Sequence, residues 1–140
     1  FLKFRPNTVG VDINEKCIEW CRHQGLNAHL MKKDILPFDD YSFDSAILDN
    51  VLEHIENPAP LLKEINRILN HKGVLVIGVP GLLGYKYDDD HKKYYSKLEA
   101  ISVLAGFGFE EDEVFGMPLN LEFLSDKMRQ YCIYGRFIKK

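Results

Sequence analysis

The sequence has few cysteines, no excess of positive charge and no long apolar run. It carries three cysteines, and this odd number, with no secretory signal visible, predicts reduced thiols in a cytoplasmic protein. The formal net charge of −3 disfavours a nucleic-acid groove, because phosphate binding needs an excess of lysine and arginine. No apolar stretch is long enough to span a bilayer. We therefore expect neither nucleic acid nor membrane as a partner.

The length and composition are those of an ordinary globular domain. At 140 residues, 46% hydrophobic and 28% charged, the chain is expected to form a single domain over residues 1–140 with a real core. Cys17 and Cys21 lie one helical turn apart and are interpreted as small hydrophobic residues on one helix face. A metal pair is the alternative, but no second pair of cysteines or histidines has matching spacing.

Helix and strand patterns alternate along the chain. The expected strands cover residues 8–11, 28–31, 45–48, 74–79, 109–115 and 130–138, and the expected helices cover residues 14–23, 58–69 and 96–105. This alternation predicts an α/β fold with a mostly parallel sheet and helices on both faces. Because the last two strands have only a short connection, one of them is expected to run antiparallel. Residues 81–93 show no periodicity and are expected to form a loop, a common setting for a lid.

Each expected helix carries signals for its ends and its buried face. In the first, Cys17, Ile18, Trp20 and Cys21 are expected to face inward. The second is expected to end at Gly73, just after Lys72. In the third, Ser96 and Glu99 form a capping box, and the side chains expected to face inward are Leu98, Ile101 and Leu104.

Polar side chains follow three of the expected strands. Asp12 and Asp34 close the first two, and Asp49 with Asn50 closes the third. The carboxyl ends of parallel strands meet at one sheet edge, where open α/β sheets bind their ligands. Two acids at successive strand tips suit a ligand with hydroxyl and amino donors, such as adenosine. Taken alone, each acid could serve as a helix cap as well as it could bind such a ligand.

His54, His91 and Tyr95 are the candidates for acid–base chemistry. His54 follows Glu53 just beyond the third strand, where it is either a structural histidine or a catalytic group. His91 lies in a run of charged residues, which is typical of a solvated loop. The alternative is a substrate lid with His91 or Tyr95 facing inward.

At this point the chain resembles the class I S-adenosylmethionine-dependent methyltransferases, most of all the branch that methylates small molecules. The resemblance covers residues 8 to about 116. It is carried by an ordered set of short motifs: Val9-Gly10-Val11-Asp12, Asp34-Ile35-Leu36-Pro37-Phe38, Phe43-Asp44, Val51-Leu52-Glu53-His54-Ile55, Leu62-Lys63-Glu64-Ile65, Lys72-Gly73-Val74-Leu75 and Gly106-Phe107. The resemblance implies a three-layer Rossmann-like sandwich, S-adenosylmethionine as cofactor and a small-molecule methyl acceptor.

The resemblance also implies roles for cofactor-binding residues. Asp12 would hold the ribose hydroxyls, and Asp34 would accept from the adenine amino group. The backbone of Ile35 would contact the ring, and Ile13 would pack on its face. Asn50 and the neighbouring backbone at Asp49 would border the methionine end.

For the chemistry, His54 would lie close to the methyl group or the acceptor. If the acceptor is a hydroxyl, His54 is the first candidate general base, and His91 or Tyr95 the second. A metal-assisted variant of the broader family uses a Glu-x-x-Glu-His set. Asn50 stands where its first glutamate would be, so no metal is expected.

One feature of the family is missing: the glycine-rich loop after its first strand. That loop would lie shortly before Phe1, so we expect the chain to lack the first strand, loop and first helix of the family. The missing strand would lie between the strands ending at Asp12 and Asp49. Two other functions stay open: an NAD-dependent dehydrogenase, which Asp12 would fit although no Tyr-x-x-x-Lys pair occurs, and a non-catalytic nucleotide-binding or scaffold domain. The acceptor would be set by residues 81–93 and 117–126.

Overall fold

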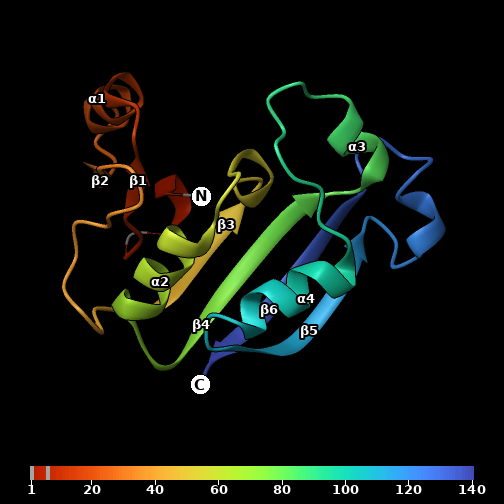
Figure 1. Ribbon diagram of the computed structural model, residues 1–140. Helices are drawn as coiled ribbons and strands as arrows, with labels where there is room; N and C mark the ends of the chain where they lie inside the picture. Colours follow the sequence, from red (N-terminus) through yellow and green to blue (C-terminus); the bar gives the residue numbers. More distant parts are fainter. Residues whose placement is uncertain (1, 6) are drawn as a thin grey trace. The chain divides into compact units, whose positions relative to one another are not determined.

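The computed structural model describes residues 2–5 and 7–140. The chain forms two compact units, Phe1–Asp39 and Asp40–Lys140, and each has its own sheet (Figure 1). Within the described residues, no helix combines the length and the apolar character that crossing a membrane requires.

The first unit is a small parallel βαβ arrangement. Its elements are η1 Leu2–Phe4, β1 Gly10–Asp12, α1 Glu15–His23 and β2 Ala28–Leu30. β1 and β2 pair in parallel, with Gly10 opposite Ala28 and Asp12 opposite Leu30. The side chain of Asn14 accepts a hydrogen bond from the backbone of Lys16 and so caps α1, as the sequence predicts.

The inward face expected for α1 is only partly correct. Ile18 is buried, but Cys17 is exposed and Trp20 keeps 62% of its surface exposed. Two strands of three residues offer too narrow a surface to cover a whole helix face within this unit. Burial therefore concentrates on the one side chain that faces the strands directly.

The second unit holds a four-stranded mixed sheet. Its elements are β3 Phe43–Asp49, η2 Leu52–His54, α2 Ala59–Ile68, β4 Leu69–Pro80, α3 Leu82–Lys86, α4 Lys97–Ala105, β5 Phe109–Met117, η3 Glu122–Leu124 and β6 Cys132–Lys139. The strand order is β3-β4-β6-β5. β3 and β4 are parallel, while β6 runs antiparallel to β4 and β5. An antiparallel strand near the C-terminus is confirmed.

The core of this unit lies on one face of the sheet. On β4 the alternating residues Leu75, Ile77 and Val79 are almost fully buried, while Val74 and Val76 of the opposite face are only half-buried. The side chains that α2 buries are those of the predicted apolar stripe: Leu61, Leu62, Ile65 and Ile68. α2 and α4 both lie in front of the sheet in Figure 1.

The predicted range of α2, residues 58–69, agrees with the structure within one residue, but the predicted stop signal at Gly73 is wrong. The helix stops at Ile68, and β4 begins at once with Leu69, so Gly73 belongs to a strand. The last carbonyls of the helix are held by a tertiary contact: the Lys139 ammonium donates to Asn66 O at 2.6 Å and to Leu69 O at 2.7 Å. Local sequence signals cannot predict this contact, because Lys139 lies in the last strand, far from α2 in the sequence.

Two further predictions need correction. Residues 81–93 are not wholly a loop, because they contain α3. In α4 the Ser96–Glu99 capping box is confirmed, but Leu98 is 77% exposed. Ala100 and Leu104 are the buried residues of that helix.

Candidate functional site

The first unit presents two carboxylates on one sheet edge. Asp12 is the last residue of β1, and Asp34 follows β2 in a left-handed conformation with φ 59°. Since the two strands are parallel, Asp12 and the turn that holds Asp34 both follow the carboxyl ends of strands at the same edge of this small sheet, and Lys32 and Ile35 close that turn. One oxygen of Asp12 accepts the backbone N–H of Asn14 at 2.8 Å. Asp12 thus supports the entry to α1, and among the described residues its second oxygen remains available for a ligand.

Two exposed isoleucines follow these acids. Ile13 is 66% exposed and Ile35 is 57% exposed. Exposed aliphatic side chains beside strand-tip carboxylates provide apolar surface for a planar ring and acceptors for sugar hydroxyls. The residues of this unit therefore fit an adenosine group.

In the second unit, polar groups gather where β3 ends. Asn50 has φ 52°, its backbone N–H donates to Gly78 O at 2.9 Å, and its side chain donates to Asp49 at 3.3 Å. Burial, followed by the charge of Asp49 and a hydrogen bond to it, raises the pKa of Tyr134 to about 12. A side chain at Gly78 would collide with the Asp49 carboxylate and the Tyr134 ring. The register of β3, β4 and β6 thus fixes the position of Asp49.

Glu53 is the least ordinary residue of this region. It lies in η2 with 1% of its surface exposed, and neither carboxylate oxygen has a hydrogen-bond partner within the described residues. Burial raises the pKa of Glu53. The prediction of site residues missed it: the sequence shows Glu53 beside His54, but not that Glu53 points inward and His54 outward.

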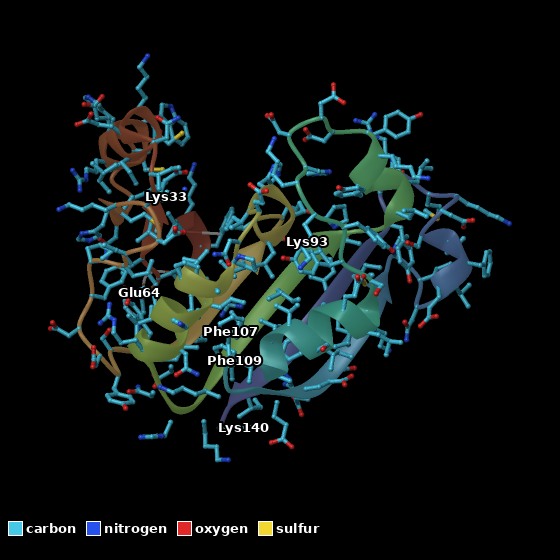
Figure 2. All side chains as sticks on the ribbon, viewed as in Figure 1. Lys33, Glu64, Lys93, Phe107, Phe109 and Lys140 are labelled. Atoms are coloured by element: carbon cyan, nitrogen blue, oxygen red, sulfur yellow. The ribbon has the colours of Figure 1, made fainter. Side chains whose placement is uncertain are left out.

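The segment after α3 brings His91 to Glu53. The backbone N–H groups of Lys92 and Lys93 both donate to Glu53 O, at 2.7 Å and 3.1 Å, in the region that Lys93 marks in Figure 2. The rings of His54 and His91 lie 4.7 Å apart. The ligand atoms of Glu53, His54 and His91 all lie within 4.8 Å of one another. Two of the three residues predicted for acid–base chemistry are therefore together in space.

Tyr95, the third of these residues, is 1% exposed, and its hydroxyl has no partner among the described residues. Burial raises the pKa of Tyr95, and the negative charges of Glu53 and Glu99 raise it further. The Tyr95 hydroxyl thus interacts electrostatically with Glu53, while its ring is buried in the core.

A cavity of about 470 Å³ lies elsewhere in the second unit, lined in part by aromatic residues. Tyr94, Phe115 and Tyr131 line it, together with polar groups that include Ser96 and Asn120. Its volume falls in the range of small-molecule sites. Of the two segments predicted to set the acceptor, residues 117–126 contribute to the lining that the structure describes, and residues 81–93 do not.

Comparison with known proteins identifies one family. Residues 2–77 match the model of the methyltransferase domain. An uncharacterised protein of Methanocaldococcus jannaschii is 30% identical over 113 residues, which cover 73% of this chain and 55% of that protein. A probable S-adenosylmethionine-dependent methyltransferase of Mycobacterium tuberculosis is 24% identical over 117 residues, which cover 78% of this chain and 43% of that protein. The chain thus spans about half the length of these curated relatives.

A solved structure shares the fold. A Thermotoga maritima S-adenosylmethionine-dependent methyltransferase, described as a possible histamine N-methyltransferase, superposes with a TM-score of 0.74 at 23% identity. The match covers 95% of this chain and 73% of that one. This likeness establishes the α/β Rossmann-like fold with antiparallel strands at the C-terminal side of its sheet.

Proposed function

This chain belongs to the methyltransferase domain family, and we propose that the protein transfers a methyl group from S-adenosylmethionine to a small-molecule acceptor. S-adenosylmethionine is the methyl donor of this family. The observation that carries the proposal for this chain is the presence of two carboxylates after the parallel strands β1 and β2, Asp12 at the end of β1 and Asp34 in the turn after β2, each followed by an exposed isoleucine.

In the first unit, adenosine recognition is assigned by residue. Asp12 accepts hydrogen bonds from the ribose hydroxyls, and Asp34 accepts one from the adenine amino group. Ile13 packs on the ring, and the backbone of Ile35 contacts its edge. Hydrogen bonds to a charged acceptor contribute about 1.5–3 kcal/mol each, so Asp12 and Asp34 carry most of the selectivity.

In the second unit, Asp49 and Asn50 border the methionine end of the cofactor. The left-handed backbone of Asn50 turns the chain sharply at the carboxyl end of β3, where both side chains are held by mutual contact. This preorganisation supports the assignment, because a fixed polar group needs no rearrangement on binding.

The cofactor supplies an already activated methyl group, so the protein mainly aligns the acceptor and excludes water. Good alignment is worth about 7–11 kcal/mol. If the acceptor is a hydroxyl, His54 takes its proton, which would accelerate transfer by about 10²–10⁴-fold. His91, next to His54, and the buried Tyr95 are the second candidates.

The acceptor is assigned to the class of small molecules because the Thermotoga protein of the same fold is described as a possible histamine N-methyltransferase. The cavity near Tyr94 and Tyr131 has a suitable volume, and its aromatic rings suit a partly apolar molecule. Neither His54 nor His91 is among the described residues that line this cavity, so an acceptor bound there would not give its proton directly to His54.

Calorimetric titration of the full-length protein with S-adenosylhomocysteine tests the proposal, with NAD as the competing ligand. We expect S-adenosylhomocysteine to bind, and we expect Asp12→Ala to weaken its binding by at least tenfold, because the variant loses the charged hydrogen bonds to the ribose hydroxyls. Glu15→Ala, which removes an exposed acid of the first turn of α1, is the matched control and should leave binding unchanged.

The other outcomes identify the alternatives. Binding of NAD without S-adenosylhomocysteine would favour a dehydrogenase. Binding of neither ligand would favour a scaffold domain and overturn the proposal.

A further inference from the structure

The carboxylate of Glu53 is buried with no compensating partner. Its residue is 1% exposed, and both oxygens lack a hydrogen bond within the described part of the chain. An ionised carboxylate removed from water costs several kcal/mol unless a positive group compensates it. The ionisable groups that interact with its charge are His54, His91, Asp49, Tyr95 and Cys132, none of which is a permanent cation. The pocket therefore requires a proton or an added cation.

His91 is oriented to offer a lone pair. Its Nδ1 lies 2.8 Å from the carbonyl oxygen of Tyr85, and a carbonyl can only accept, so Nδ1 carries the hydrogen. In the neutral ring, Nε2 is then the unprotonated nitrogen. Donation of the other ring N–H to a backbone carbonyl is the arrangement that metal-binding histidines show. The Tyr85 ring stacks on His91 at 5.4 Å and helps to hold this orientation.

We propose that Glu53, His54 and His91 bind a divalent transition-metal ion of the zinc class. Their ligand atoms already lie within 4.8 Å of one another, and ligands at zinc distances require separations of about 3.4 Å. His54 is exposed and can rotate to close the difference. One carboxylate and two imidazoles leave a fourth position open, as in catalytic zinc sites.

The backbone assembles this set from two distant segments. Glu53 and His54 come from η2, and His91 comes from the segment after α3, which is attached at Glu53 O through Lys92 and Lys93 (Figure 2). Asp88, whose carboxylate lies 3.9 Å from His91 Nε2, adds negative charge beside the site. The expectation of no metal was based on Asn50, which is not a member of this cluster.

A metal here does not depend on the proposed methyl transfer. If both hold, a metal with an open position would bind an acceptor oxygen or nitrogen and favour loss of its proton. His54 would then be a ligand rather than the base. Metal affinity is measured without substrate or cofactor, so its failure is distinguishable from failure of the proposed function.

The experiment is a competition titration of Zn²⁺ into full-length protein freed of metal with EDTA, against a chromophoric chelator. We expect one ion to bind the wild type, and Glu53→Gln and His91→Ala each to weaken it at least tenfold. His71→Ala is the matched control, because His71 is an exposed histidine away from the proposed site. It lies near the start of β4, which pairs with the start of β3, whereas η2 follows the end of β3. This variant should leave the affinity unchanged.

Visible absorption with Co²⁺ provides a second readout. A three-ligand site gives the intense bands of tetrahedral cobalt in the wild type and loses them in His54→Ala, a change at an exposed side chain that should fold even if Glu53→Gln does not. Absence of Zn²⁺ binding, or equal affinity in the wild type, His54→Ala and His91→Ala, would show that a proton compensates Glu53, and the metal site would be refuted.

Discussion

The carbonyl oxygen of Glu53 accepts the backbone N–H of Lys92 at 2.7 Å. Lys93 donates to the same oxygen, so the segment after α3 is fixed to η2 through main-chain groups. A main-chain hydrogen bond survives a change of side chain as long as the backbone N–H is kept. A substitution that removes the N–H can therefore be compared with one that removes only the side chain.

Lys92→Pro removes the N–H, whereas Lys92→Ala keeps it. We expect the proline variant to lose about 0.5–1.5 kcal/mol of unfolding free energy, the net value of one hydrogen bond, and the alanine variant to change little. Urea denaturation measures both. Equal losses in the two variants would mean that the lysine side chain, rather than its backbone, holds the segment.

Tyr95→Phe removes a buried hydroxyl that has no partner among the described residues. Removing an unsatisfied polar group while keeping the ring should leave stability unchanged or raise it. Thermal unfolding gives the comparison, and Tyr131→Phe is a control at a second buried tyrosine. A large loss of stability in Tyr95→Phe would reveal a hydrogen bond that the structure does not show.

The same Tyr95→Phe variant tests catalysis. If Tyr95 is an acid or base of the reaction, turnover falls by about 10²–10⁴-fold while the melting temperature stays constant. Unchanged turnover would remove Tyr95 from the candidates and leave His54 and His91.

Gly78→Ala places a methyl group against the Asp49 carboxylate and the Tyr134 ring. Both neighbours sit on paired strands and cannot withdraw without breaking the register, so we expect a loss of about 1–3 kcal/mol of unfolding free energy. Gly106→Ala at the end of α4 is the control and should stay within about 1 kcal/mol of the wild type. Denaturation of the two variants side by side measures the difference.

Ser96→Ala breaks the capping box of α4 and should cost about 1 kcal/mol. The backbone and side-chain hydrogen bonds of Ser96 lower the pKa of Glu99. The stability that this carboxylate adds is therefore fully present above its ordinary pKa of 4.5 and is lost as pH falls through the lowered folded-state value.

Melting temperature as a function of pH should consequently fall less steeply below pH 4.5 in Glu99→Gln than in the wild type. Glu110→Gln, at an exposed residue of β5, is the control. An unchanged acid slope in Glu99→Gln would show that the cap does not depend on ionised Glu99.

Much of the local structure was predictable, because its signals are short-range. The apolar stripe of α2 and the capping box at Ser96 depend on residues within one or two helical turns. The stop signal of α2 was predicted wrongly at Gly73, because Lys139 of β6, and not a local glycine, satisfies carbonyls at the end of this helix. The exposure of Trp20 was also not predicted. The spacing of apolar residues shows which face of a helix is apolar, but it does not show whether the neighbouring sheet is wide enough to cover that face.

By itself, the sequence determined the order of the strands and of the longer helices, the antiparallel strand near the C-terminus and the placement of Asp12 at a strand tip, because each depends on local periodicity and chain direction. Only the tertiary structure decided that Glu53 turns inward and that His91 comes from beyond α3 to meet it. Burial of a carboxylate and convergence of two distant segments depend on packing, which no local pattern encodes.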